Sequence, residues 1–263
     1  MSSLRPSAPR LAKGIAGFAF LLLYIPLITL VVYSFRTQTA GTGETSGWTL
    51  EWYQRVFLNE SAMSALGTSL WVGFWCTLGA TLIGSAAALA LDRGKFRGRE
   101  FMENLIYMPL ILPEIVLGLS LLIWFVMLRV TLGSFSIILA HITFSVSYVI
   151  ITVKSRLQGF DRTLEEAAVD LGAGSSQVFW KVTFPLIWPG ILSGALMAFT
   201  LSFDDFLITF FTAGVGSDTL PLKIYSMIKF GVTPEINALS TMLLVATFVL
   251  VAVFFRAEAP EAV

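Results

Sequence analysis

Three carboxylates of this chain lie within or directly beside long apolar runs. Glu114 lies inside an otherwise uncharged run from Leu105 to Leu128, and Asp204 and Asp205 close a second uncharged run. A carboxylate in apolar surroundings is costly unless it is paired or hydrated, so it is a functional candidate by default. The chemistry that such residues offer is the binding or passage of a cation.

Other kinds of site find little support in the composition. The single cysteine, Cys76, and the single histidine, His141, lie in apolar runs, where packing is the simpler interpretation. They exclude an internal disulfide, a zinc cluster and a histidine-based metal site. No G-x-x-x-x-G-K-[ST] loop is present to bind ATP. With 17 basic and 17 acidic residues the net charge is zero, which gives no case for nucleic acid. We therefore expect neither a catalytic site nor a metal or cofactor in this chain.

The elements that must position the carboxylates are membrane-spanning helices. Of the 263 residues, 56% are hydrophobic and only 13% are charged, and the mean hydropathy is +0.80. A bilayer core about 30 Å thick is crossed by about 20 helical residues. The uncharged runs thus predict an all-α membrane protein, one transmembrane domain over residues 1–263. Its six expected spans are at about residues 14–35, 64–91, 105–128, 133–153, 186–212 and 236–255.

Basic residues set the expected orientation. An even number of spans places both termini on one side, and twelve of the 17 Lys and Arg residues fall on that side. The other five are Arg36, Arg55, Arg129, Lys223 and Lys229. Because cytoplasmic loops carry the excess of Lys and Arg, both termini are predicted to be cytoplasmic.

Within these spans each acid has two interpretations. Glu114 follows Pro113, whose missing N–H is expected to kink the helix near mid-membrane and to open it toward a cavity. The alternative is a Glu114 that hydrogen-bonds to a neighbouring helix. Asp204 and Asp205 are expected toward the outer part of the bilayer, where the alternative is that they simply end the span. Adjacent helical residues point about 100° apart, so one acid can face a path while the other caps or pairs.

The longest segment expected to face the cytoplasm, residues 159–185, is also the most specific. Thr163 and Glu166 predict the start of a helix, and Gly172 can adopt a positive φ and end it. A second short helix is expected from Ser175 or Ser176 to near Pro185. By itself this pattern is compatible with a well-capped connector.

The full string is more informative. Glu166-Ala167-Ala168 is followed after three residues by Gly172, and after nine more residues by Val182-Thr183-Phe184-Pro185. This pattern resembles the EAA motif of ABC-importer permeases. The resemblance implies the type I importer fold, with cytoplasmic coupling helices that dock on an ATP-hydrolysing subunit. The residues that it assigns to ATPase coupling are Glu166, Ala167, Ala168, Asp170 and Gly172.

Further strings narrow the branch. Three further strings are Leu112-Pro113-Glu114-Ile115, Leu201-Ser202-Phe203-Asp204-Asp205 and Leu220-Pro221-Leu222-Lys223. They resemble segments of the second permease subunit of spermidine/putrescine importers. A polyamine needs carboxylates for its ammonium groups and aromatic faces for its methylenes. The substrate-path candidates that this implies are Glu114, Asp204, Asp205 and Trp52, the last in an expected amphipathic segment over residues 48–57. Related branches carry opines, amino-acid-like compounds or other small solutes, and these alternatives stay open.

The resemblance also implies the assembly. The expected partners are a second permease subunit of similar fold, two copies of an ABC ATPase that uses ATP and Mg²⁺, a periplasmic or lipid-anchored solute-binding protein, and membrane lipid. The expected location is the bacterial inner membrane. Two rival classes are an ion-coupled secondary transporter that uses Glu114 as its ion site, which six spans without an inverted repeat disfavour, and a membrane scaffold, which gives Glu114 no role.

Overall fold

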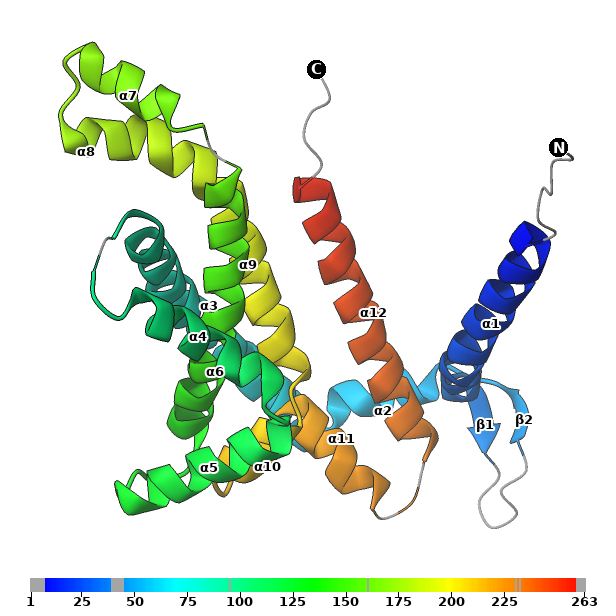
Figure 1. Ribbon diagram of the computed structural model, residues 1–263. Coiled ribbons are helices and arrows are strands. Elements are labelled where there is room, and N and C mark those ends of the chain that lie inside the picture. Colours follow the sequence, from blue (N-terminus) through cyan, green and yellow to red (C-terminus); the bar gives the residue numbers. More distant parts are fainter. Residues whose placement is uncertain are drawn as a thin grey trace, which may run out of the picture. The chain divides into compact units, whose positions relative to one another are not determined.

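The computed structural model describes residues 8–38, 45–94, 96–159, 161–229, 231 and 233–258. The chain separates into two compact units, which are described in turn. One unit comprises residues 1–60 and 224–246, and the other comprises residues 61–223 and 247–263. Figure 1 shows that almost every element is a helix, in agreement with the all-α expectation.

The first unit holds α1 (Ala8–Ser34), a short β-ribbon, α2 (Glu51–Leu58) and the first part of α12 (Pro234–Glu258). The ribbon was not expected: β1 (Arg36–Gln38) and β2 (Thr45–Trp48) pair antiparallel, with Arg36 opposite Trp48. Helix α2 overlaps residues 48–57, the segment that was expected to be amphipathic, and ends one residue beyond it. Thr233 precedes α12, and its hydroxyl accepts a hydrogen bond from the Ile236 N–H at 3.4 Å, as an N-cap does.

The second unit is built around three long helices. They are α3 (Glu60–Arg93), α6 (Ser134–Gln158) and α9 (Phe184–Asp204), and α6 and α9 run side by side. Small residues permit this approach, because a Cβ added at Gly194 of α9 would lie 3.3 Å from the Val149 Cα of α6. The shared core is formed by Ala80, Ala88, Leu91, Val149, Ile150, Val153, Leu157, Ile187, Ile191 and Ala198.

A second hydrophobic cluster joins shorter helices to α6. It brings together α5 (Glu114–Met127), α6 and α10 (Leu207–Thr212). Its buried members are Leu117, Phe125, Ala140, Phe144 and Ile208. Glu114 begins α5, and Asp204 and Asp205 lie just before α10.

Two of the expected spans are interrupted. The chain bends by 109° between helix α4 (Arg99–Ile111) and α5, at a break next to Pro113. Helix α9 ends at Asp204, and α10 begins three residues later. Helix α9 is preceded without a gap by η1 (Phe179–Thr183), a π-helical turn, and by α8 (Ser175–Val178). The second coupling helix therefore does not end near Pro185 but continues into the membrane-spanning helix.

Length and composition identify several membrane-crossing helices among the described residues. Four are long and apolar enough alone, at residues 12–34, 60–93, 134–158 and 175–204. The bent pair α4–α5 makes a fifth if it counts as one span. The stretch Pro234–Val249 of α12 is apolar but shorter.

Candidate functional site

The break between α4 and α5 places Glu114 at the start of a helix. Leu112 and Pro113 have extended ψ values of 136° and 133°, so the helix cannot continue through them. Proline lacks the N–H that a continuing helix would use, while its carbonyl accepts hydrogen bonds from Val116 and Leu117. The kink expected from Pro113 is thus confirmed. Glu114 is exposed in the first turn of α5, where the helix dipole favours a negative charge.

Helix α5 packs closely on α10. A Cβ added at Gly118 would lie 2.8 Å from Phe211 Cδ2 and 3.3 Å from Ile208 Cα. Glu114 is one helical turn before Gly118 and so shares its face of α5. Glu114 thus begins the helix that packs on α10, and Asp204 ends the helix that precedes α10.

The adjacent acids Asp204 and Asp205 have different surroundings. Asp204 is the last residue of α9 and is exposed. Asp205 has an extended backbone, and its side chain is only 5% exposed. Its carboxylate accepts hydrogen bonds from the Thr209 N–H at 2.8 Å and from the Thr209 hydroxyl at 2.9 Å. Asp205 therefore caps α10, whereas Asp204 remains exposed.

A buried histidine completes the surroundings of Asp205. His141 of α6 has no exposed surface. Its Nε2 lies 3.2 Å from Asp205 Oδ2 and 3.0 Å from Thr209 Oγ1. Its Nδ1 lies 2.7 Å from Ser202 Oγ. His141 is thus more than the packing residue that its apolar run suggested.

Trp52 belongs to the other unit, in α2. Its indole N–H donates to the Arg36 carbonyl at 2.9 Å, and the Arg55 guanidinium lies 4.9 Å from the centre of its ring. The tryptophan is half-buried. One ring face of Trp52 is therefore already occupied by a cation of its own chain.

The coupling segment forms a helical hairpin at one end of α6 and α9 (Figure 1). Helix α7 (Thr163–Asp170) carries Glu166, Ala167, Ala168 and Asp170. Gly172 has a φ of +86°, and the Ala173 N–H donates to the Ala168 carbonyl at 3.0 Å. This six-residue closure is a glycine C-cap, so the turn expected at Gly172 is confirmed. Ala168 is half-buried, and the other residues with an expected coupling role are exposed.

Two ion pairs connect this hairpin to the end of α3. Arg162 Nη2 donates to Asp92 Oδ2 at 2.9 Å. Arg93 pairs with Glu165, which also accepts a hydrogen bond from the Thr183 hydroxyl of η1. Sequence reasoning missed Asp92, Arg93 and Glu165 because partners about 70 residues apart leave no local pattern.

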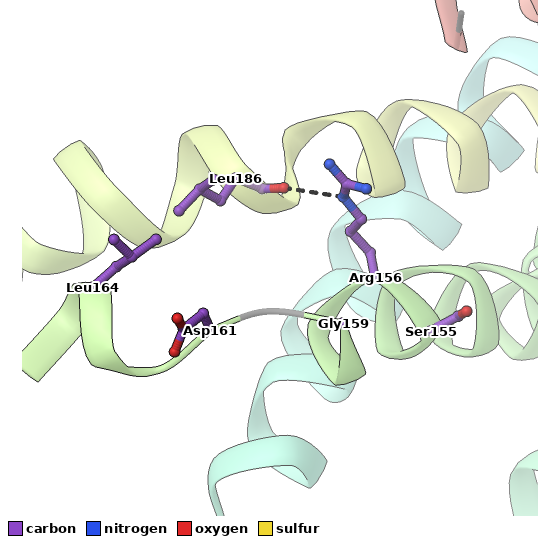
Figure 2. A pocket seen from close by; sticks show the side chains of 6 residues that line it. All are labelled: Ser155, Arg156, Gly159, Asp161, Leu164 and Leu186. Carbon is purple, nitrogen blue, oxygen red and sulfur yellow. Dashed lines mark hydrogen bonds between the residues drawn. The ribbon is translucent and has the colours of Figure 1, made fainter. Parts of the chain in front are cut away.

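A pocket of about 220 Å³ lies where the hairpin meets α6 and α9. Figure 2 shows Arg156 of α6 reaching across to the Leu186 carbonyl of α9, with the Nε donating at 3.3 Å. Asp161 lines the same pocket and accepts a hydrogen bond from the Thr163 N–H at 3.0 Å. The hydrogen bonds from the backbone and side chain of Thr163 lower the pKa of Asp161. Asp161 thus accepts the first N–H of α7, whereas Arg162 is at the N-cap position and makes no side-chain cap hydrogen bond. The capping box predicted from Thr163 and Glu166 was therefore wrong.

No metal site accompanies these features in the described part of the chain. No group of three or more His, Cys, Asp or Glu side chains there could hold an ion.

Comparisons with known proteins agree with the residue pattern. Residues 80–258 match the family "Binding-protein-dependent transport system inner membrane component". The chain is 42% identical over 245 residues to the spermidine/putrescine transport system permease protein PotC of Escherichia coli (strain K12), covering 92% of each chain. It is 42% identical over 242 residues to the putrescine transport system permease protein PotI of the same strain, covering 89% of this chain and 85% of that protein.

Solved structures share the fold. A chain of a bacterial ABC transporter involved in the import of the acidic polysaccharide alginate superposes with a TM-score of 0.74, at 16% identity. The match covers 97% of this chain and 99% of that chain. At such low identity, the likeness concerns the fold alone.

Proposed function

Because the chain belongs to the family of binding-protein-dependent transport system inner membrane components, we propose that it is a permease subunit of an ATP-driven polyamine importer in the bacterial inner membrane. Its similarity to permeases of spermidine/putrescine and putrescine transport systems supports this substrate class. The structural observation that supports the proposal is that Glu114 and Asp204 are both exposed, each at a break between helices.

The chemistry of the acid pair suits a polyamine. A ligand with two or more ammonium groups can interact favourably with both carboxylates at once. In the proposed path, Glu114 and Asp204 contact the ammonium groups of spermidine or putrescine. Asp205 lies outside the path and supports it by capping α10.

Trp52 is proposed as an aromatic contact for the arriving cation. The Arg55 guanidinium occupies one face of the ring. An ammonium group that takes this face must first displace Arg55. On this face of the ring, the solute and Arg55 would therefore compete for Trp52.

The proposed topology has six spans in a single domain, with both termini in the cytoplasm. Helices α1, α3, the α4–α5 pair, α6, α9 with α10, and α12 supply them in chain order. The excess of Lys and Arg on one side supports this orientation. In this orientation the α7–α8 hairpin lies in the cytoplasm.

The proposed assembly contains this chain, a second permease subunit of similar fold, two ABC ATPase subunits and a periplasmic or lipid-anchored receptor for the solute. ATP and Mg²⁺ would be bound by the ATPase subunits. Glu166, Ala167, Ala168, Asp170 and Gly172 form the surface that meets an ATPase subunit. Movement of that subunit on ATP binding would pass through the hairpin to α6 and α9.

Uptake by the complete transporter in lipid vesicles tests this function. We expect uptake of radiolabelled putrescine or spermidine that requires both the receptor and ATP. An ATPase partner that cannot hydrolyse ATP supplies the matched control and should abolish uptake. Uptake driven by an ion gradient without ATP would overturn the proposal in favour of secondary transport. ATP-driven uptake of an opine or amino acid, with none of a polyamine, would overturn the substrate class alone.

A further inference from the structure

His141 connects the two sides of the α9–α10 break. Its imidazole comes from α6, its Nδ1 contacts Ser202 of α9, and its Nε2 contacts Thr209 of α10. The Asp205 carboxylate, in the break itself, lies 3.2 Å from the same Nε2. A single ring that is fully buried thus contacts the helix before the break, the helix after it, and the acid between them.

The hydrogen-bond network fixes the role of each group. The Thr209 hydroxyl has one hydrogen, which it donates to Asp205, so it can only accept from His141. The Nε2 of His141 therefore carries a proton that points toward Thr209 and Asp205. Nδ1 is left to contact the Ser202 hydroxyl. Every polar atom of the imidazole has a partner, as a buried ring requires.

The network decides which acid faces outward. Asp204 and Asp205 are adjacent, but the Asp205 side chain is 5% exposed beside His141, whereas Asp204 is exposed. Without the imidazole, the Asp205 carboxylate would lose a donor in a site of low dielectric, where an unpaired charge is costly. Turning outward would relieve this cost and would add a third exposed carboxylate to Glu114 and Asp204.

We propose that His141 is a positioning residue for solute transport. By holding Asp205 and Ser202 across the break, it keeps Asp205 out of the path and limits the outward acids to Glu114 and Asp204. The inference rests on the proposed function and deepens it, because it makes His141 a determinant of discrimination between solutes that carry two and three ammonium groups. His141 itself does not contact the solute.

The test compares two solutes in the complete transporter in vesicles. Uptake is measured with the receptor saturated by putrescine or by spermidine, so that receptor affinity does not enter, and the ratio of the two maximal rates is recorded. We expect His141→Leu to change this ratio by about fivefold or more, in line with the coupling that one buried hydrogen-bonded group provides. A role in folding alone would lower both rates equally and leave the ratio unchanged.

Conservative and control variants sharpen the result. His141→Gln keeps a donor toward Asp205 and should restore most of the wild-type ratio. Thr143→Val removes a hydroxyl from the same helix that bonds only to the Leu139 carbonyl, and should leave the ratio unchanged. If His141→Leu fails to assemble, Thr209→Val removes one partner of the ring and carries the same expectation.

Each outcome bears on a definite statement. Suppose that the wild-type transporter moves polyamines and that the assembled His141 and Thr209 variants have the same ratio of putrescine to spermidine rates as the wild type. This result overturns the inference about His141 and leaves the proposed function intact. A wild-type transporter that moves neither polyamine overturns both. A changed ratio in His141→Leu that His141→Gln restores supports the positioning role.

Discussion

Arg162, just before α7, donates a hydrogen bond to Asp92 near the end of α3, and 70 positions in the chain separate the two residues. The neighbouring pair of Arg93 and Glu165 joins the same two elements. The coupling hairpin is thus held at two charged contacts by a helix other than the two from which it emerges. A displacement of α7 would therefore act on α3 directly through these two ion pairs.

We expect Arg162→Gln to weaken the coupling between ATP hydrolysis and uptake. Arg162 is 62% exposed, and exposed ion pairs contribute only about 0.2–1 kcal/mol. The amount of solute moved per ATP should therefore fall by about twofold to fivefold, while receptor binding stays intact. Exchanging the charges, with Asp92→Arg and Arg162→Asp together, should recover part of the loss.

Arg99→Gln is the matched control for the Arg162 variant. It removes an ion pair with Glu103 within a single helix, so it should not alter the ratio of uptake to ATP hydrolysis. An equal loss in both variants would show that the contact with α3 has no particular role in coupling.

Leu171 provides a test of the docking surface. It follows α7 and is 90% exposed, so burial against an ATPase subunit would contribute about 1.5–3 kcal/mol. Leu171→Glu should reduce co-purification of the ATPase subunit by about tenfold or more. Leu58→Glu in α2, at a leucine that is 82% exposed, should not. Retention of the ATPase by the Leu171 variant at the wild-type level would place the docking surface elsewhere.

Gly118 provides a test of the packing that positions Glu114. A methyl group there would meet Phe211 at 2.8 Å, and overpacking of this kind costs about 1–3 kcal/mol. Gly118→Ala should therefore lower the melting temperature of the purified complex and reduce uptake. Gly67→Ala is the control, since a Cβ at this position in α3 has no neighbour within 4 Å. Equal melting temperatures for the two variants would contradict the close approach of α5 and α10.

Asp204→Asn and Asp205→Asn should have different effects, although the residues are adjacent. Asp205 is a buried cap, and loss of its charged hydrogen bonds should destabilise the complex by about 2 kcal/mol. Asp204 is exposed, so Asp204→Asn should leave the melting temperature unchanged while it reduces polyamine uptake. Glu114→Gln should resemble Asp204→Asn. If Asp204→Asn assembles and transports at the wild-type rate, Asp204 is not part of the path.

Local signals were enough for much of the fold. Uncharged runs of about 20 residues must be helical in a bilayer, because every backbone N–H and C=O needs an internal partner. Pro113 lacks a donor and so marked the break before Glu114. Gly172 tolerates positive φ and so marked the end of α7. Each of these effects depends on a few consecutive residues, and the structure shows the break at Pro113 and the turn at Gly172 where they were expected.

Other features had no local signal. Neither proline nor glycine lies at Asp205 and Phe206, so the sequence did not indicate the break between α9 and α10. The β-ribbon of three and four residues is likewise too short to produce a clear alternating pattern.

The sequence by itself determined the class of protein, the position of the coupling segment and the candidate acids, because composition, proline and glycine act over one or two helical turns. Only the tertiary structure decided which of two adjacent aspartates faces outward, since that depends on His141, more than 60 residues earlier in the chain. The pairing of Asp92 with Arg162 has the same origin. Such partners are selected when helices pack, and the identity of a residue does not reveal which distant side chain it will meet.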